Sequence, residues 1–195
     1  MKIVRIALWV LVGVAIVGVG GLYLSKGRDT PLIASVTEIG GPFRLVDTQG
    51  RAVSRDDLLG RPHAIFFGYT HCPDVCPTTL WEMTQHLREL GEDGDKLRVV
   101  FVTVDPERDT QQVMQQYLSA FDKRILGLTG SREAVDEAVK AYRAFYKVHP
   151  PDEDGDVLVD HTADVYLFDA KGNLRSTISY GEDPEAARAK IRRLI

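Results

Sequence analysis

The chain has 195 residues, of which 44% are hydrophobic and 27% are charged, the composition of an ordinary globular protein. The first 28 residues hold four of the 24 basic residues and none of the 28 acidic ones, so the body that follows carries 20 basic against 28 acidic residues, a net charge of −8. This acidic balance argues against a nucleic-acid partner, because phosphate binding needs clustered Lys and Arg.

An uncharged apolar run begins the chain. It extends from Ile6 to Leu24, nineteen residues, and a helix needs about 20 to cross a bilayer core. A cleaved signal peptide has a shorter apolar region, of about 7–15 residues, and small residues at its cleavage site. The basic flanks also argue against a buried core helix. We therefore expect an uncleaved transmembrane signal anchor over residues 6–24.

The basic residues around this run predict its orientation. The amino terminus, Lys2 and Arg5 precede the run, and Lys26 and Arg28 follow it. The excess on the amino side favours a cytoplasmic N-terminus over residues 1–5. Residues 25–39 then form a polar tether. Residues 40–195 are expected to be one domain outside the cytoplasm, long enough to bury a core.

The first part of this domain alternates strands and helices. GPFRLVDTQGRAVS predicts a β-hairpin that turns at DTQG. Residues 64–69 and 97–104 are dense apolar runs, typical of buried central strands. Between them, apolar residues recur at helical spacing and a glycine ends the pattern, which predicts a helix with one buried face; these residues are Leu80, Met83, Leu87, Leu90 and Gly91.

The second part continues the alternation. Residues 109–121 and 131–147 are predicted helices with a short strand between them, and residues 164–180 are a predicted hairpin that turns at AKGN. A last helix is expected to start at Asp183 or Pro184. The order predicts an α/β, thioredoxin-like fold with an N-terminal β-hairpin and an inserted hairpin or loop.

Both cysteines of the chain lie in one proline-rich turn, AIFFGYTHCPDVCPTTL. The turn follows the strand over 64–69, and Pro77 fits the first position of the next helix. The positive end of the helix dipole favours the thiolate, the form that attacks disulfides and binds soft metals. A redox pair and half of a metal site therefore both remain open for Cys72 and Cys76.

The spacing of the two cysteines bears on the choice. A disulfide staple across so short a loop would stabilise the fold little. Thiol–disulfide oxidoreductases use C-x-x-C, whereas three residues separate Cys72 from Cys76. The wider, proline-braced turn could hold two sulfurs apart around an ion.

A metal site needs a further ligand, and His161 is the candidate. It precedes a predicted strand and follows HPPDEDGDV, whose composition is typical of a mobile loop. The other histidines are expected to be structural or solvated, or too close to Cys72; they are His63, His71, His86 and His149. Two sulfurs and an imidazole suit copper or zinc. A structural zinc site normally has four protein ligands, so copper fits better.

Four motifs of the chain, in order, are GGPFRLVDTQG at 40–50, FFGYTHCPDVCP at 66–77, VTVDPERDT at 102–110 and DHTADVYLFDAKG at 160–172. Together they resemble the Sco (SenC/PrrC) family, copper-binding thioredoxin-like proteins that help to assemble the copper centre of cytochrome oxidase. The resemblance covers roughly residues 40 to 180. It implies that Cys72, Cys76 and His161 bind Cu(I) and Cu(II).

The resemblance also implies that Asp105 lies close to the site, where it either contacts the metal ligands without binding the metal or has a redox role. Turn formation and helix capping are the alternative for Asp105 and Asp109. Asp160 could orient the ring of His161, or be solvated. Tyr69 and Phe67 are expected to pack under the cysteine turn.

The leading functional prediction is a membrane-anchored copper metallochaperone. It would deliver copper to the copper-bearing subunit of cytochrome c oxidase, or prepare the copper A centre there, and other copper chaperones would be further partners. The first alternative is an enzyme, a thiol–disulfide reductase in which Cys72 and Cys76 cycle through a disulfide. A peroxiredoxin-like peroxidase would need a Thr or Ser and an Arg around the reactive cysteine, and only Thr70 lies near in the sequence. A copper-dependent sensor of redox state also stays open.

The expected location is the bacterial cytoplasmic (inner) membrane, with a single pass and the soluble domain on the periplasmic side. Mitochondrial relatives exist in the family. Here, however, the apolar run starts at residue 6, with no Arg- and Ser-rich presequence before it.

Overall fold

The computed structural model describes Trp9, Gly13 and residues 39–195. The expected N-terminal segment (1–5), anchor (6–24) and tether (25–39) therefore lie almost wholly outside the described residues. Within the described residues, no helix combines the length and apolar character needed to cross a membrane. Residues Glu38–Ile195 form one compact unit.

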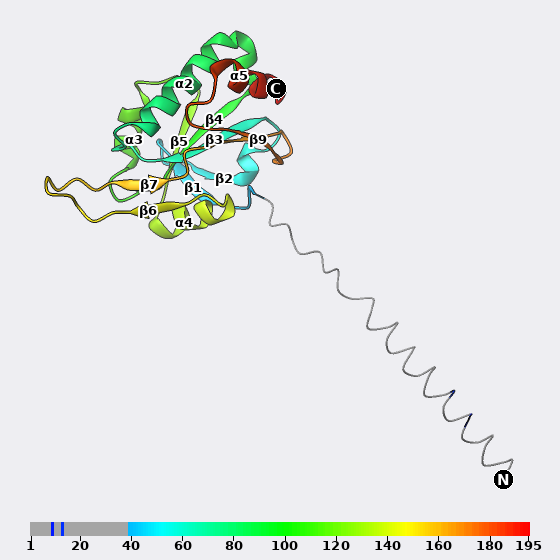
Figure 1. Cartoon of the computed structure of the whole chain (residues 1–195), viewed down its shortest axis with the longest axis horizontal. Helices are drawn as coiled ribbons and strands as arrows, with labels where there is room; N and C mark the ends of the chain where they lie inside the picture. Colours follow the sequence, from blue (N-terminus) through cyan, green and yellow to red (C-terminus); the bar gives the residue numbers. More distant parts are fainter. Residues whose placement is uncertain (1–8, 10–12, 14–38) are drawn as a thin grey trace. The chain divides into compact units, whose positions relative to one another are not determined.

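A mixed seven-stranded sheet with the order β2-β1-β5-β4-β3-β8-β9 forms the centre of this unit (Figure 1). The strands β3, β4 and β5 are parallel, while antiparallel hairpins form both edges. The α/β fold with an N-terminal hairpin is confirmed. The strand bounds are Arg44–Asp47 (β1), Ala52–Ser54 (β2), His63–Gly68 (β3), Arg98–Thr103 (β4), Ile125–Thr129 (β5), Val165–Phe168 (β8) and Leu174–Ile178 (β9).

Helices cover both faces of the sheet. Figure 1 shows α2 and α5 together on one side and α4 on the other. All six residues of β3 are buried, as expected for a strand covered on both faces. The helices are Val75–Glu89 (α2), Gln111–Leu118 (α3), Arg132–Ala141 (α4) and Pro184–Arg192 (α5), with 3-10 turns at Arg55–Leu58 (η1) and Gly91–Lys96 (η2).

Helix α2 starts earlier than Pro77 predicted. Its first residue is Val75 and its N-cap is Asp74, so Pro77 and Cys76 both lie in the first turn. Proline is tolerated there because the first-turn N–H groups have no partner within the helix. The early start places Cys76 on the helix itself.

Helix α4 is shorter than the predicted helix over 131–147. It ends at Ala141, and Arg143 has a φ of 51°, in the left-handed region. Ala144 N–H then donates to the carbonyl of Val139 at 3.0 Å, which closes the end of the helix. Tyr146 and Lys147 belong instead to a strand.

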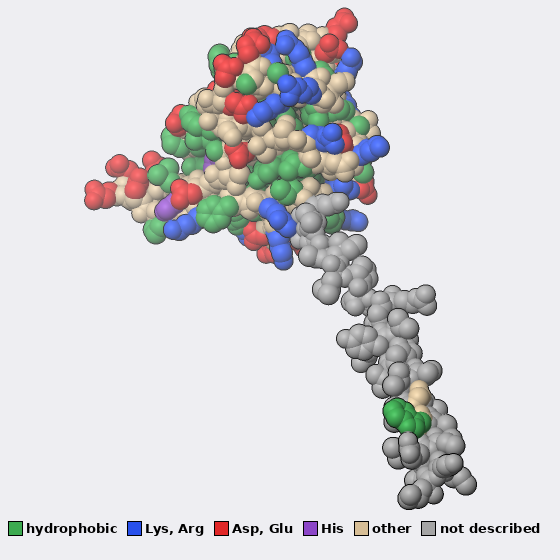
Figure 2. Space-filling model, turned by 45° about the vertical axis from the view of Figure 1, so that its right-hand side comes forward, with side chains coloured by type: hydrophobic (Ala, Val, Ile, Leu, Met, Phe, Trp, Pro, Cys, Tyr) green, Lys and Arg blue, Asp and Glu red, His purple; other side chains and the backbone are tan. Residues whose placement is uncertain are grey.

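That strand forms a second, two-stranded sheet. Tyr146–Val148 (β6) pairs antiparallel with Val159–His161 (β7), and this pair is separate from the main sheet. It corresponds to the expected inserted hairpin. Figure 2 shows acidic side chains at its projecting tip, where the sequence places Asp152, Glu153, Asp154 and Asp156.

Two phenylalanines provide a test of the core. Phe168 is 0% exposed and Phe145 is 59% exposed. We expect Phe168→Ala to lower the free energy of unfolding by about 3–5 kcal/mol, because His63 stacks on its ring and Tyr142 stands edge-on to it, at 5.1 and 5.4 Å between centroids. The matched control Phe145→Ala should change it by less than about 0.5 kcal/mol. Urea unfolding of the full chain measures both values, and equal losses would contradict the assignment of the core.

Candidate metal centre

Cys72, Cys76 and His161 meet in space, with one ligand atom of each within 4.8 Å of the others. The Sγ of Cys76 lies 3.2 Å from Nε2 of His161. Cys72 lies in the turn after β3, Cys76 in the first turn of α2, and His161 ends β7. The structure thus brings together all three predicted ligands.

A bare backbone at Gly68 makes this approach possible. A Cβ atom there would lie 2.6 Å from the Sγ of Cys76 and 2.8 Å from the ring of Phe101. Such distances do not occur between real atoms, so the position requires glycine. The close approach lets the backbone N–H of Tyr69 point to the Cys76 sulfur at 3.5 Å.

The two sulfurs differ in protonation. Hydrogen bonds from the Cys76 side chain and from backbone N–H groups lower the pKa of Cys72 far below its usual range, against the effect of burial. Burial first, and then the charge and hydrogen bonding of Cys72, raise the pKa of Cys76. The metal-free site therefore holds a half-buried thiolate at Cys72 and a buried thiol at Cys76.

The ring of His161 is oriented by its own neighbour. Its Nδ1 lies 3.0 Å from the carbonyl oxygen of Thr162. A carbonyl only accepts, so Nδ1 carries the proton of the neutral ring and Nε2 offers its lone pair to the sulfurs. The rings of Phe66 and Tyr69 stand edge-on to His161, each at 5.8 Å between centroids.

Of the two aromatic residues expected under the turn, Tyr69 lies there and Phe67 does not. Phe67 packs against Tyr142 and Tyr166. Side chains alternate along a strand, so Phe66 occupies the face of β3 toward His161 and Phe67 the opposite face.

Asp160 does not face the ring of His161. Its carboxylate lies 2.7 Å from Nε2 of His149, across the hairpin. Neighbouring residues of a strand point to opposite sides, so Asp160 and His161 cannot share a centre here. The carbonyl of Thr162 makes the contact that orients the ring instead.

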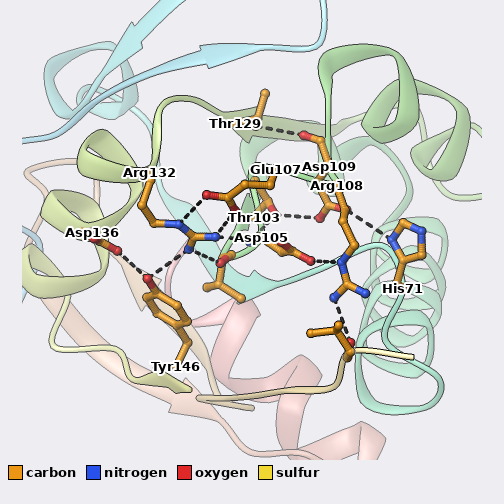
Figure 3. A network of polar contacts seen from close by, with 12 residues as sticks. His71, Thr103, Asp105, Glu107, Arg108, Asp109, Thr129, Arg132, Asp136 and Tyr146 are labelled. Atoms are coloured by element: carbon orange, nitrogen blue, oxygen red, sulfur yellow. Dashed lines mark hydrogen bonds and ion pairs between the residues drawn. The ribbon is translucent and has the colours of Figure 1, made fainter. Parts of the chain in front are cut away.

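A buried carboxylate, Asp109, fixes the cysteine turn. It is 0% exposed and accepts hydrogen bonds from the N–H and hydroxyl of Thr70, at 2.9 and 2.5 Å, and from the hydroxyl of Thr103 at 2.6 Å. His71 lies beside it, with Nδ1 at 3.6 Å (Figure 3). The sequence suggested only capping or turn formation for Asp109, because nothing in the local pattern indicates a contact 39 residues away.

Asp105 acts on a different part of the structure. It is 6% exposed, its carboxylate pairs with Arg108, and it lies 3.9 Å from Arg132 (Figure 3). Arg108 in turn donates to the carbonyl of Val157 at 2.9 Å and lies over the ring of Tyr69. The structure therefore links Asp105 to the hairpin through Arg108.

Side chains hold this hairpin against the main domain. Besides Arg108 at Val157, the hydroxyl of Tyr69 accepts from the N–H of Val159 at 3.2 Å, and Arg132 donates to the hydroxyl of Tyr146 at 3.0 Å. We call Arg108, Tyr69, Arg132 and Tyr146 the hairpin latch. Because the hairpin is not paired with the main sheet, the latch provides side-chain contacts that help to position it.

The remaining histidines lie outside the ligand group. His63 and His86 are buried, and burial lowers the pKa of both rings. His149 is paired with Asp160.

The donor set fits a soft or borderline metal ion. Two sulfurs and one imidazole suit copper or zinc and do not suit Mg²⁺ or Ca²⁺. An ion bound at about 2.3 Å from sulfur and about 2.0 Å from nitrogen would place these two atoms about 3.3–3.8 Å apart. The observed distance of 3.2 Å between the Sγ of Cys76 and Nε2 of His161 would need to lengthen only slightly to hold such an ion.

Comparison with known proteins agrees with this site. A family model described as SCO1/SenC matches residues 33–195. A SCO2-like protein of Rickettsia conorii is 36% identical over 167 residues, 80% of this chain and 82% of that protein.

Solved structures with the same fold carry copper. Bradyrhizobium japonicum ScoI with copper bound is 46% identical, with a TM-score of 0.75 over 80% of this chain and 99% of that one. Yeast Sco1 with copper bound is 37% identical, with a TM-score of 0.74 over 80% and 87% of the two chains.

The asymmetry of the thiols predicts their reactivity. We expect iodoacetamide to modify Cys72 of the reduced, metal-free chain well before Cys76, because Cys72 is a half-buried thiolate and Cys76 a buried thiol. Since the pKa of Cys72 is lowered, its rate should stay nearly constant from roughly pH 8 to roughly pH 5, where an ordinary thiol slows about tenfold per unit. Peptide mass mapping measures this, and faster labelling of Cys76 would contradict it.

Proposed function

The chain belongs to the SCO1/SenC family, and on this basis we propose that it is a copper metallochaperone. It binds copper through Cys72, Cys76 and His161 and delivers it to, or prepares, the copper A centre of cytochrome c oxidase. The convergence of these three ligand atoms within 4.8 Å carries the proposal. The copper-bound relatives from Bradyrhizobium japonicum and yeast support it.

The ligand set accommodates both copper valences. Thiolates suit Cu(I), and imidazole also suits Cu(II). His161 comes from a hairpin that forms no strand pair with the main sheet, so we infer that this ligand can withdraw while the two sulfurs stay in place. A chaperone needs such a ligand because it has to release its cargo to a client.

The location belongs to the same proposal. Residues 6–24 anchor the chain in the bacterial cytoplasmic membrane, with residues 1–5 on the cytoplasmic side. Residues 25–39 tether a periplasmic domain over residues 40–195. The uncharged run and the basic residues around it support this arrangement.

The difference between the two thiols favours a second activity, thiol–disulfide reduction. The thiolate of Cys72 attacks a disulfide of the client, forms a mixed disulfide and releases one client thiolate. Cys76 then loses its proton and attacks the Cys72 sulfur, which releases the second client thiolate and leaves a Cys72–Cys76 disulfide. The client gains two electrons and the chain loses two.

Substitution of His161 separates the two activities. In His161→Ala we expect the affinity for Cu(II) to fall by on the order of 100-fold or more, above the loss typical of an outer contact, while dithiol exchange stays within about twofold. The reduced full chain is titrated anaerobically with Cu(I) and with Cu(II), and stoichiometry, sulfur-to-copper charge transfer and spin resonance are recorded.

The matched control is His149→Ala, which removes a histidine from the same hairpin. It should keep one copper per chain with unchanged spectra. If His161→Ala binds Cu(II) as tightly as His149→Ala does, the three-ligand site is wrong. If copper only oxidises the thiols of the unsubstituted chain and remains free, the reductase is the function.

The hairpin latch predicts the rate of copper release. Arg108→Gln removes the positive charge that pairs with Asp105 and weakens the hydrogen bond to the carbonyl of Val157. We expect Cu(II) to leave about tenfold faster to a chelator, measured by stopped-flow absorbance, with the alkylation rate of metal-free Cys72 unchanged. Arg175→Gln, at an arginine 63% exposed, is the control. Equal release rates in the two variants would show that the latch does not position His161.

A further inference from the structure

A cleft lined by basic side chains lies at the edge of the sheet opposite the cysteines. The metal-binding residues follow the carboxyl end of β3, whereas the cleft lies where β3, β4 and β5 begin. Because parallel strands align their amino ends, basic residues from separate segments meet there. The cleft encloses about 470 Å³, and its charged lining residues are Arg51, Arg61, Arg98, Lys123 and Arg124.

Among the residues that the structure describes, no acidic side chain lines this cleft. Arg51 and Arg124 are ion-paired with aspartates outside the lining. Within residues 39–195, by contrast, no carboxylate lies within 4.0 Å of Arg61, Arg98 or Lys123. These three positive charges therefore share one cleft and form no ion pair among the described residues, on a body with a net charge of −8; the opposing influence on Arg98 is the charge of Asp57.

The two half-buried arginines have unused donors. Arg61 donates to the carbonyls of Lys96 and Leu97, at 3.2 and 2.8 Å, and Arg98 to the carbonyl of Asp57. A guanidinium has five N–H groups, so both keep N–H groups for a ligand. Burial first, and then the nearby positive charge of Arg61, lower the pKa of Arg98, while the negative charge of Asp57 opposes this shift. A bound anion would relieve the repulsion between the two arginines.

We propose that this basic cleft is a binding site for a phosphoanion. Planar guanidinium groups match the geometry of phosphate oxygens. Thr48 and Gln49 from the β1–β2 turn line the same cleft and supply neutral donors. Phosphate oxygens of this kind are carried by free pyrophosphate and by the headgroup of an anionic phospholipid.

Calorimetric titration of the full chain tests the site. The chain is kept in nonionic detergent at about 0.15 M ionic strength, where exposed charges are screened beyond about 8 Å. The probes are pyrophosphate, a short-chain phosphatidylglycerol and a short-chain phosphatidylcholine. We expect one pyrophosphate or one phosphatidylglycerol per chain, and no binding of phosphatidylcholine beyond that of the detergent.

Two variants remove single charges from the cleft. Lys123→Gln changes an exposed lysine and leaves folding intact, and Arg98→Gln removes one of the two guanidinium groups that repel each other. Each should weaken binding about tenfold, whereas Lys171→Gln, an exposed lysine in the β8–β9 turn, should not change it. Urea unfolding serves as the folding control in all three variants.

The pattern of binding identifies the source of the phosphate. Binding of pyrophosphate alone assigns the cleft to a free phosphoanion, and binding of phosphatidylglycerol assigns it to a lipid headgroup. If neither binds, or if the cleft variants bind as tightly as Lys171→Gln, the proposal is overturned. Copper binding does not enter either result, so a failure of the proposed metal site can be distinguished from a failure of the proposed anion site.

Discussion

The hydrogen bonds of one buried carboxylate hold the cysteine turn in place. Asp109 connects the turn at Thr70 to the end of β4 at Thr103, and its own backbone carbonyl accepts from the hydroxyl of Thr129 in β5. Hydrogen bonds to a charged group contribute about 1.5–3 kcal/mol each, and a buried acceptor left without them costs a similar amount. The turn that carries Cys72 is thus fixed to two central strands.

The same carboxylate contributes to the chemistry of the sulfurs. Its negative charge is one of the causes that raise the pKa of Cys76, after burial and Cys72. A metal ion binds thiolates, so an ion that enters has to displace the proton of Cys76. The site therefore couples metal binding to proton release, because the raised pKa of Cys76 favours its protonated form in the metal-free site.

Sequence patterns predicted those parts of the structure that depend on local periodicity. The hairpin at DTQG, the buried strands β3 and β4, and the apolar face of α2 follow from spacing alone. The end of α4 did not, because Tyr142 continues the helical pattern and only the left-handed Arg143 breaks it. The roles of Asp109 and Arg108 depend on contacts with residues 39 and 49 positions away. The sequence shows the acids and the arginine, but not which partners the fold gives them.

The main sheet also separates two kinds of chemistry. Sulfur and imidazole ligands gather beyond the carboxyl end of β3, and basic side chains gather where β3, β4 and β5 begin. The strands β3 and β4 have six residues each, which is about 20 Å of extended chain. At physiological ionic strength the Debye length is about 8 Å, so charge at one edge is largely screened from the other. Because of this screening, an anion bound at the amino ends of the strands would change the electrostatic environment of the metal ligands little.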